Sequence, residues 1–196
     1  MGVDCGGLGT CEVVAGQATC DCVPGYHAEG ATCVLDSVDC ADPAVLCVDD
    51  TPGENQEYAT IQEAADGVSP GEVVLIFDGR YAGFELATSG TASERITVRA
   101  LGTGAVIDSD GPDGYGVVLR NVSPVTIEGL RIVGMTARGL AHREATPTEP
   151  SVGLIIRDNV VQDAGAEGMY LSEVSEALIE GNEITGSGAS GADRTH

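Results

Sequence analysis

The protein is 196 residues long and 42% of them are hydrophobic, so it can bury a core and is not expected to be disordered as a whole. Nine arginines and no lysine stand against 31 acidic residues, which gives a formal net charge of −22. A surface this acidic disfavours nucleic acid and anionic lipid as partners, and the absence of lysine excludes Schiff-base, P-loop and lysine-base chemistry in this chain.

All seven cysteines lie within residues 1–47. That density indicates a disulfide scaffold made in an oxidising compartment, so we expect a secreted or cell-surface protein. No secretion signal follows Met1, and we therefore expect the sequence to be part of a longer protein. The longest apolar run, Val73–Phe77, is too short to cross a bilayer, so we predict no membrane insertion. A polar, turn-rich stretch at 48–55 is predicted to link residues 1–47 to residues 56–196.

The first region resembles the epidermal-growth-factor-like module, from the second to the sixth cysteine of that pattern. The marks are Cys20 and Cys22, separated by one residue, and the turn Pro24–Tyr26 that follows. The resemblance implies the disulfides Cys5–Cys20 and Cys22–Cys33. It leaves Cys11 as the unpaired thiol, because the partner of Cys11 in that pattern is the missing first cysteine. Cys40 and Cys47 enclose a short loop and are expected to pair with each other. We interpret these cysteines as staples of a small module rather than as a metal site.

The second region opens with a short amphipathic helix. Thr60 and Glu63 form a capping box, and Gly67 is predicted to end the helix in a left-handed conformation. After a turn at Ser69–Gly71, the run Val73–Gly79 has the length and β-branching of a buried strand.

A repeat of short apolar segments then predicts the fold. The aligned columns are Leu130/Asn159/Asn182, Ile127/Ile156/Ile179, Val125/Leu154/Ala177, Ile132/Val161/Ile184 and Gly139/Gly168/Gly191. An earlier echo aligns Val73 with Ile96 and Leu75 with Val98. Short strands at a period near 23 residues are typical of a solenoid in which each coil places three strands around a triangular core.

The columns also predict the role of individual side chains. Asn159 and Asn182 are interpreted as a structural ladder, and the corner residue before each is expected to have a positive φ. Ile156 is expected to contact Ile127 and Ile179 in neighbouring coils. Arg157, the next residue, is expected to face outward, where its truncation would cost under about 0.5 kcal/mol if it is unpaired.

Several motifs resemble the N-terminal region of right-handed parallel β-helix proteins. They are Thr60–Ala65, Ser69–Gly71, Asp78–Tyr81, Ser89–Thr91 and Ile96–Ala100. This superfamily includes pectate lyases and chondroitinase-B-like and alginate lyases. The resemblance implies an all-β chain, a right-handed parallel β-helix whose N-terminal end is capped by the short helix. Lyases of this fold resemble one another in using a lysine base, an arginine acid and calcium, and that lysine has no counterpart here.

We place a candidate groove on the strands that follow the glycine column. Alternation predicts an inward-facing set of Val117, Leu140, Met169, Leu119, His142 and Leu171. The outward-facing set is Val118, Ala141, Tyr170, Arg120, Arg143 and Ser172. Tyr170 is expected to stack on a sugar ring, and Arg120 and Arg143 to hold carboxylates. The alternative is a solvated strand face on which acids such as Glu144 and Glu173 neutralise the arginines.

Two further sets of residues have both a structural and a functional interpretation. Asp108, Asp110 and Asp113 lie close together in a segment that also contains two glycines for the bend, and the segment resembles a calcium-binding loop. The alternative is an acidic turn between strands. His142 has the chemistry of a general base, but its register with leucines favours a buried histidine.

The sequence therefore favours an extracellular β-helix protein that contacts polysaccharide and resembles polysaccharide lyases, with catalysis not supported by these residues. A calcium cofactor fits this interpretation. The alternative is a non-catalytic surface or adhesion protein in which the β-helix is a rigid rod.

Overall fold

The structure is a computed structural model that describes residues 9–14, 17–22, 26–29, 32–35, 40–53, 56–143 and 150–188. The chain divides into two compact units between Asp39 and Cys40. Among the described residues, no helix has the length and apolar character needed to cross a lipid bilayer.

The N-terminal unit contains two antiparallel hairpins. Their strands are β1 (Gly9–Val14) with β2 (Gln17–Cys22), and β3 (Tyr26–Glu29) with β4 (Thr32–Leu35). Cys20 is disulfide-bonded, as expected for a stapled module. Cys5 and the side chains of Cys11, Cys22 and Cys33 lie outside the described part, so their pairing and the growth-factor-like character of the unit stay predictions.

The boundary between the units lies earlier than we predicted. Strand β5 (Val45–Val48), which we had divided between the module and the linker, pairs in parallel with β6 (Val73–Ile76) and is buried. The predicted disulfide Cys40–Cys47 is confirmed, with 5.8 Å between the two Cα atoms, but it belongs to the second unit. Cysteine content misplaced the boundary because this disulfide closes the loop that leads into the first solenoid strand.

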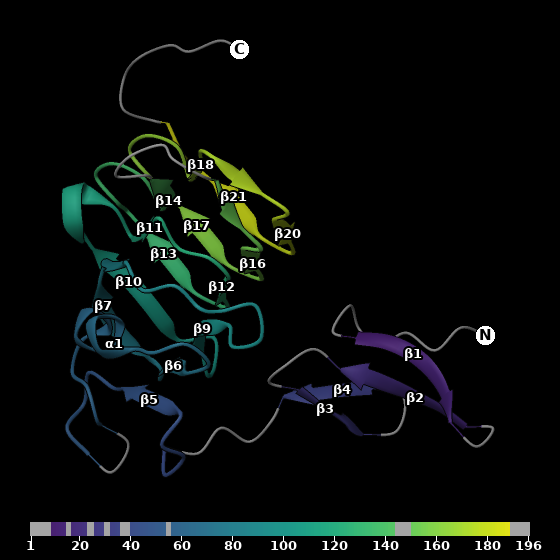
Figure 1. Cartoon of the computed structure of the whole chain (residues 1–196). Helices are drawn as coiled ribbons and strands as arrows, with labels where there is room; N and C mark the ends of the chain where they lie inside the picture. Colours follow the sequence, from purple (N-terminus) through teal and green to yellow (C-terminus); the bar gives the residue numbers. More distant parts are fainter. Residues whose placement is uncertain are drawn as a thin grey trace. The chain divides into compact units, whose positions relative to one another are not determined.

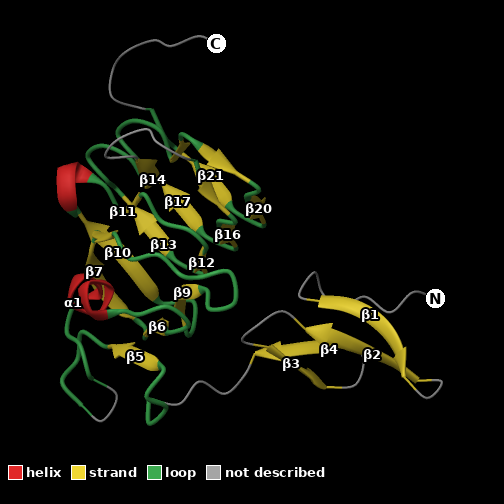
Figure 2. Cartoon of the chain, viewed as in Figure 1, coloured by secondary structure: helices red, strands yellow, loops and turns green. Residues whose placement is uncertain are grey.

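The second unit is a parallel β-solenoid, as predicted, with most of its strands stacked in three sheets (Figures 1 and 2). Two further short strands, β15 (Ser151–Val152) and β19 (Val174–Ser175), pair in parallel with each other. The six-stranded sheet is formed by β5, β6, β9 (Ile96–Ala100), β12 (Val125–Glu128), β16 (Ile155–Arg157) and β20 (Leu178–Glu180). The five-stranded sheet is formed by β7 (Gly79–Ala82), β10 (Ala105–Ser109), β13 (Arg131–Val133), β17 (Val160–Gln162) and β21 (Glu183–Thr185). The four-stranded sheet is formed by β8 (Phe84–Leu86), β11 (Val117–Arg120), β14 (Leu140–Arg143) and β18 (Met169–Leu171).

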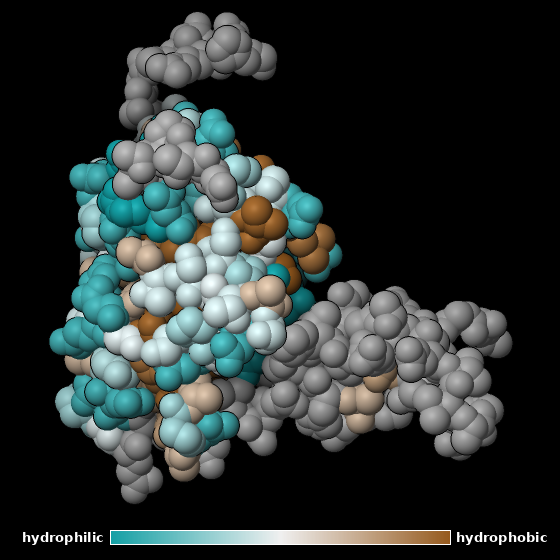
Figure 3. Space-filling view, viewed as in Figure 1, coloured by the Kyte–Doolittle hydropathy of each residue, from teal (hydrophilic) through white to brown (hydrophobic). Residues whose placement is uncertain are grey.

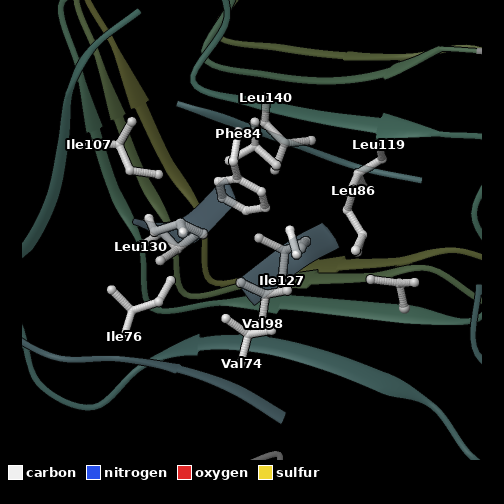
Figure 4. Close-up of a cluster of buried hydrophobic side chains, with 14 of the residues drawn as sticks. Val74, Ile76, Phe84, Leu86, Val98, Ile107, Leu119, Ile127, Leu130 and Leu140 are labelled. Carbon is white, nitrogen blue, oxygen red and sulfur yellow. The ribbon is translucent and has the colours of Figure 1, made fainter. Parts of the chain in front are cut away.

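Successive coils place equivalent residues in register, which builds the core as columns of side chains (Figure 4). Ile127 lies opposite Ile156, and Ile156 opposite Ile179, as the repeat predicted. The same holds for Ile132 opposite Val161 in the five-stranded sheet. Because each column is apolar along its length, every coil buries its inner face against the next one.

The earlier echo of the repeat was aligned wrongly by one residue. Val73 pairs with Thr97 rather than Ile96, so that Val74 and Val98 share the column of Ile127. The physical reason is that β6 is buried on both sides, so its apolar run has no alternation from which a register can be read.

A short helix, α1 (Ile61–Gly67), covers the N-terminal end of the four-stranded sheet (Figure 1). The predicted capping box of Thr60 and Glu63 is present. The Gln62 side chain accepts from the backbone N–H of Glu85 at 2.8 Å and donates to its carbonyl at 3.1 Å, so it satisfies the free edge of β8. The prediction that Gly67 ends the helix in a left-handed conformation was wrong. The chain instead leaves the helix through Val68, which is extended.

The predicted asparagine ladder is confirmed at the corner between the six- and five-stranded sheets. The Asn159 side chain accepts from Leu130 N–H at 3.0 Å and donates to Ile127 O at 3.0 Å and to Asn182 Oδ1 at 2.9 Å. The corner residues before this column have positive φ, as expected, at 71° for Gly129, 55° for Asp158 and 63° for Gly181. The amides of the buried Asn159 and the partly buried Asn182 thus replace the backbone partners that the corner removes.

The outer face of the six-stranded sheet carries a buried ion pair. Arg157 Nε donates to Glu128 Oε2 at 2.6 Å, and the two residues are only 5% and 7% exposed. Arg157 points outward as predicted, but it is paired and enclosed, so the small truncation cost that we attached to an unpaired arginine does not apply.

The last described coil is the most exposed part of the solenoid core. Leu178, Ile179 and Ile184 are each more than two-fifths exposed, and Figure 3 shows hydrophobic surface in this region. Strands β20 and β21 are the last members of their sheets in the described part of the chain.

Candidate functional site

The candidate site is the outer face of the four-stranded sheet. Its register aligns Val118 with Ala141 and Ala141 with Tyr170, as predicted for the outward set. The predicted inward set is confirmed: Val117, Leu119, Leu140 and His142 are buried, and Met169 and Leu171 pack against the core. Alternation along three stacked strands therefore presents Arg120, Arg143 and Tyr170 on the same side of the sheet.

Part of this outer face is covered by the side chain of Tyr115, a residue that we did not predict to belong to the site. Tyr115 packs on Val118 and Ala141, and all three residues are buried. The turn 110–115 delivers this ring. Asp110 anchors it by accepting hydrogen bonds from the backbone N–H and the hydroxyl of Thr136, at 2.9 and 2.7 Å. The outward strand face is thus apolar where Tyr115 covers it and polar around that ring.

Arg138 is a second residue that we did not predict, and it links two tyrosines. Its guanidinium carbon lies 4.3 Å from the ring centre of Tyr170 and 5.7 Å from that of Tyr115. Its Nη1 donates to the Tyr115 hydroxyl at 2.9 Å, and its Nε donates to Glu167 Oε2 at 2.7 Å. The hydrogen bond that Arg138 donates to Glu167, more than the contact with Tyr115, raises the Arg138 pKa above its ordinary value. The only sequence signal was its position next to the glycine column, at Gly139.

Arg143 completes the cationic side of this face. Its guanidinium carbon lies 5.4 Å from the Tyr115 ring centre, and its Nη1 donates to Asp113 Oδ2 at 2.7 Å. Asp113 belongs to the one-turn 3-10 helix Pro112–Gly114, within the same turn that carries Tyr115. A single turn therefore supplies both an aromatic ring and a carboxylate to Arg143.

Arg120 makes a two-pronged ion pair with Glu85 from the neighbouring strand β8, with 2.6 Å between Nε and Oε1. This hydrogen-bonded pairing lowers the Glu85 pKa and raises the Arg120 pKa, each against a smaller effect of burial. The face is thus neutralised by acids, as in our alternative interpretation, through Glu85, Glu167 and Asp113. Glu173 is exposed with a positive φ of 50°, and Glu144 lies outside the described residues.

The three aspartates of the predicted calcium loop have three different partners. Asp108 pairs with Arg80, Asp110 with Thr136 and Asp113 with Arg143. Within the described ranges, no cluster of three or more acidic, histidine or cysteine residues forms a common ligand set for a metal ion. We therefore derive no step through calcium, and its role stays a prediction to be tested by titration.

His142 lies inside the solenoid, as its register indicated. Its Nδ1 contacts the carbonyl oxygen of Ser172 at 2.7 Å and its Nε2 contacts Ser151 Oγ at 2.7 Å. Because a carbonyl only accepts, Nδ1 carries a proton and, in the neutral ring, Nε2 accepts from the Ser151 hydroxyl. This is the arrangement of a base next to a nucleophile, but both residues are buried and serve the core.

Taken together, the outer face brings together three of the nine arginines, two tyrosines and three carboxylates. Guanidinium groups bind carboxylates in two-pronged fashion, and tyrosine rings stack on sugar rings. The arrangement therefore combines guanidinium donors that can bind a carboxylate with one partly exposed ring, that of Tyr170.

Comparisons with known proteins support the fold. No family model and no curated protein matches the sequence. Among solved structures, the chain is similar to an alginate lyase from Paenibacillus sp. strain FPU-7, with a TM-score of 0.50 and 22% identity over 65% of this chain. The similarity covers 55% of that lyase, so this chain spans about half of its length. At this identity the likeness supports the parallel β-helix alone.

Proposed function

We propose that the second unit binds an acidic, uronate-containing polysaccharide along the outer face of β8, β11, β14 and β18. The observation that carries the proposal is Arg138, whose guanidinium contacts the rings of both Tyr115 and Tyr170, while Arg143 contacts the same Tyr115 ring. The whole chain carries a net charge of −22, and among its described residues these arginines contact aromatic rings on the outer face of one sheet. The structural likeness to an alginate lyase agrees with such a ligand class.

The chemistry of the face explains how such a ligand would be held. Tyr170 is 39% exposed, which leaves ring surface for a sugar. The arginines supply donors in a planar fork that matches a carboxylate, whereas the surrounding acids accept sugar hydroxyls. Screening limits repulsion from distant acids to about 10 Å at 0.1 M salt, so local arginines decide the interaction.

The proposal is binding rather than cleavage. The chain contains no lysine, and His142 is enclosed in the core, so neither supplies an accessible general base on this face. We also propose that the protein works outside the cell, since the disulfide Cys40–Cys47 is of the kind that persists in an oxidising compartment.

The test is calorimetric titration with alginate, polygalacturonate and a neutral glucan, each with calcium and with a chelator. We expect the uronates to bind and Tyr170→Ala to weaken them roughly tenfold, the equivalent of about 1.4 kcal/mol for a lost stacking contact. Leu101→Ala, which removes another exposed apolar side chain outside this face, is the matched control and should change nothing. Equal affinity of wild type and Tyr170→Ala would contradict the site.

A second candidate, a non-catalytic structural rod, is favoured by one observation. Each of the three arginines already has a carboxylate partner within the chain. The rod predicts that no glycan binds under either calcium condition, although the protein is folded. Absorbance of an unsaturated sugar product in the same mixtures would show cleavage and would overturn our choice of binding over catalysis.

A further inference from the structure

We propose that Asp113 is an internal competitor for the ligand: its carboxylate occupies the place on Arg143 that a uronate carboxylate takes, and binding exchanges one for the other. This inference rests on the proposed function, because it names the arginine that the acidic sugar contacts. It also predicts that the pairing of Asp113 with Arg143 in the free protein lowers the affinity for the acidic sugar.

The three ion pairs of the face differ in how firmly they are built. Glu85 and Arg120 both stand on strands and meet through two hydrogen bonds, with side chains 23% and 34% exposed. Arg138 is fixed by Glu167 and by contacts with both tyrosines. These two arginines are therefore held in place whether or not a ligand is present.

The pair between Arg143 and Asp113 is the weakest built. A single hydrogen bond joins the two groups, from Nη1 to Oδ2, and their side chains are 38% and 63% exposed. Exposed pairs of this kind gain little free energy because water competes for both charges. A ligand carboxylate that makes two hydrogen bonds to the same guanidinium replaces this contact at small cost.

The turn that carries Asp113 allows the exchange without a change of fold. The Asp110 side chain anchors the turn to Thr136, and Gly111 N–H donates to Tyr115 O at 2.8 Å. Gly111 also lies so close to the backbone of Gly83 that a Cβ atom at Gly111 would approach it to 2.3 Å. Rotation of the Asp113 side chain is therefore sufficient to free Arg143, and Tyr115 stays packed beneath.

Charge gives the exchange a direction that an experiment can detect. The Asp113 carboxylate pairs with Arg143 and, in the same position, repels an incoming carboxylate. Asp113→Asn removes both effects and keeps the size of the side chain. We expect this variant to bind alginate oligosaccharides about fivefold more tightly at most, the equivalent of about 1 kcal/mol for an exposed ion pair.

The experiment is a double-mutant cycle measured by calorimetry on the full chain, with Asp113→Asn, Arg143→Gln and the double variant. The matched control is Asp66→Asn, an exposed aspartate on α1 that loses the same charge. We expect tighter binding for Asp113→Asn, weaker binding for Arg143→Gln and wild-type affinity for Asp66→Asn. In the Arg143→Gln background, Asp113→Asn should give a smaller gain than in the wild type, because only the loss of repulsion remains. A neutral glucan should not distinguish Asp113→Asn from wild type.

The failures are distinguishable. If Arg143→Gln weakens binding but Asp113→Asn leaves it unchanged or weaker, Asp113 orients Arg143 and the exchange is refuted while the proposed function stands. If neither wild type nor Asp113→Asn binds any uronate, and melting curves show that both are folded, the proposed function fails and the exchange with it.

Discussion

Two sheets of the same solenoid place an arginine beside an acid on their outer faces, with opposite consequences. Glu128 and Arg157 of the six-stranded sheet are almost fully enclosed, whereas Asp113 and Arg143 beside the four-stranded sheet are exposed. Strand alternation predicts on which side of a sheet a residue lies, but not whether water reaches that side. The enclosed pair therefore stabilises the fold, whereas Arg143 of the exposed pair can exchange Asp113 for the carboxylate of a ligand.

Removing one partner of the enclosed pair should have the largest effect on stability. Arg157→Ala leaves Glu128 buried without its ion-pair partner, and such losses cost about 3–5 kcal/mol. Urea unfolding measures the change. Arg131→Ala is the control, because Arg131 is exposed on β13 and should cost under about 1 kcal/mol. Similar costs for the two variants would show that the outer face at Arg157 is open to water.

Truncation in the buried column of Ile127, Ile156 and Ile179 should have the next largest effect on stability. Ile156→Ala removes a fully buried side chain that stacks between Ile127 and Ile179, and we expect it to cost about 2–5 kcal/mol. Ile184→Ala, in the exposed last coil, should cost less in the same denaturant titration, because its side chain is 44% exposed. The reverse order would mean that the last coil is covered in solution.

The inner face was predictable because it repeats. Ile156 and Asn159 stand in columns that align over three successive repeats, and such a column is explained by contact between equivalent residues of neighbouring coils. The register failed only at β6, where the run Val73–Phe77 offers no polar residue to show which side faces inward. The domain boundary failed for a similar reason, since β5 is apolar throughout and cannot be distinguished locally from the end of a cysteine-rich module.

The Asn159 ladder tests how far the inner face depends on polar contacts. Asn159→Ala leaves the N–H of Leu130 and the carbonyl of Ile127 without their partner, and an unsatisfied buried group costs about 1–3 kcal/mol. Asn182→Ala should cost less, because Asn182 is only partly buried and water can replace its contacts. Thermal melts of the two variants compare these costs, and equal shifts would indicate that Asn182 is enclosed as well.

The candidate site was predictable only in part. Arg120, Arg143 and Tyr170 follow from alternation, and all three face the same side. Tyr115 and Arg138 lie in turns, where no period specifies direction, so their contacts depend on how distant coils stack. The pairing of Arg143 with Asp113 likewise joins residues that are 30 positions apart, through a turn whose path the sequence did not reveal.

The smallest expected effect concerns the remaining ion pair of the site and its dependence on pH. Arg120 lowers the Glu85 pKa in the folded state below the ordinary value of 4.5, so the folded protein binds fewer protons at Glu85 than the unfolded chain does. The stability that this pair contributes is therefore present at neutral pH and is lost as the pH falls from about 4.5 through the lowered pKa.

The variant Glu85→Gln tests this pH dependence, because it should lack this part of the stability profile. Because both side chains are partly exposed, we expect Glu85→Gln to differ from wild type by under about 1 kcal/mol at neutral pH and to converge with it in acid. Asp113→Asn should show a smaller difference at neutral pH, because its pair with Arg143 is more exposed. Chemical unfolding of the three proteins across the acid range measures these differences. A Glu85→Gln profile parallel to that of wild type would show that the pair with Arg120 does not form in solution, and the distinction between a fixed and an exchangeable arginine on this face would then be lost.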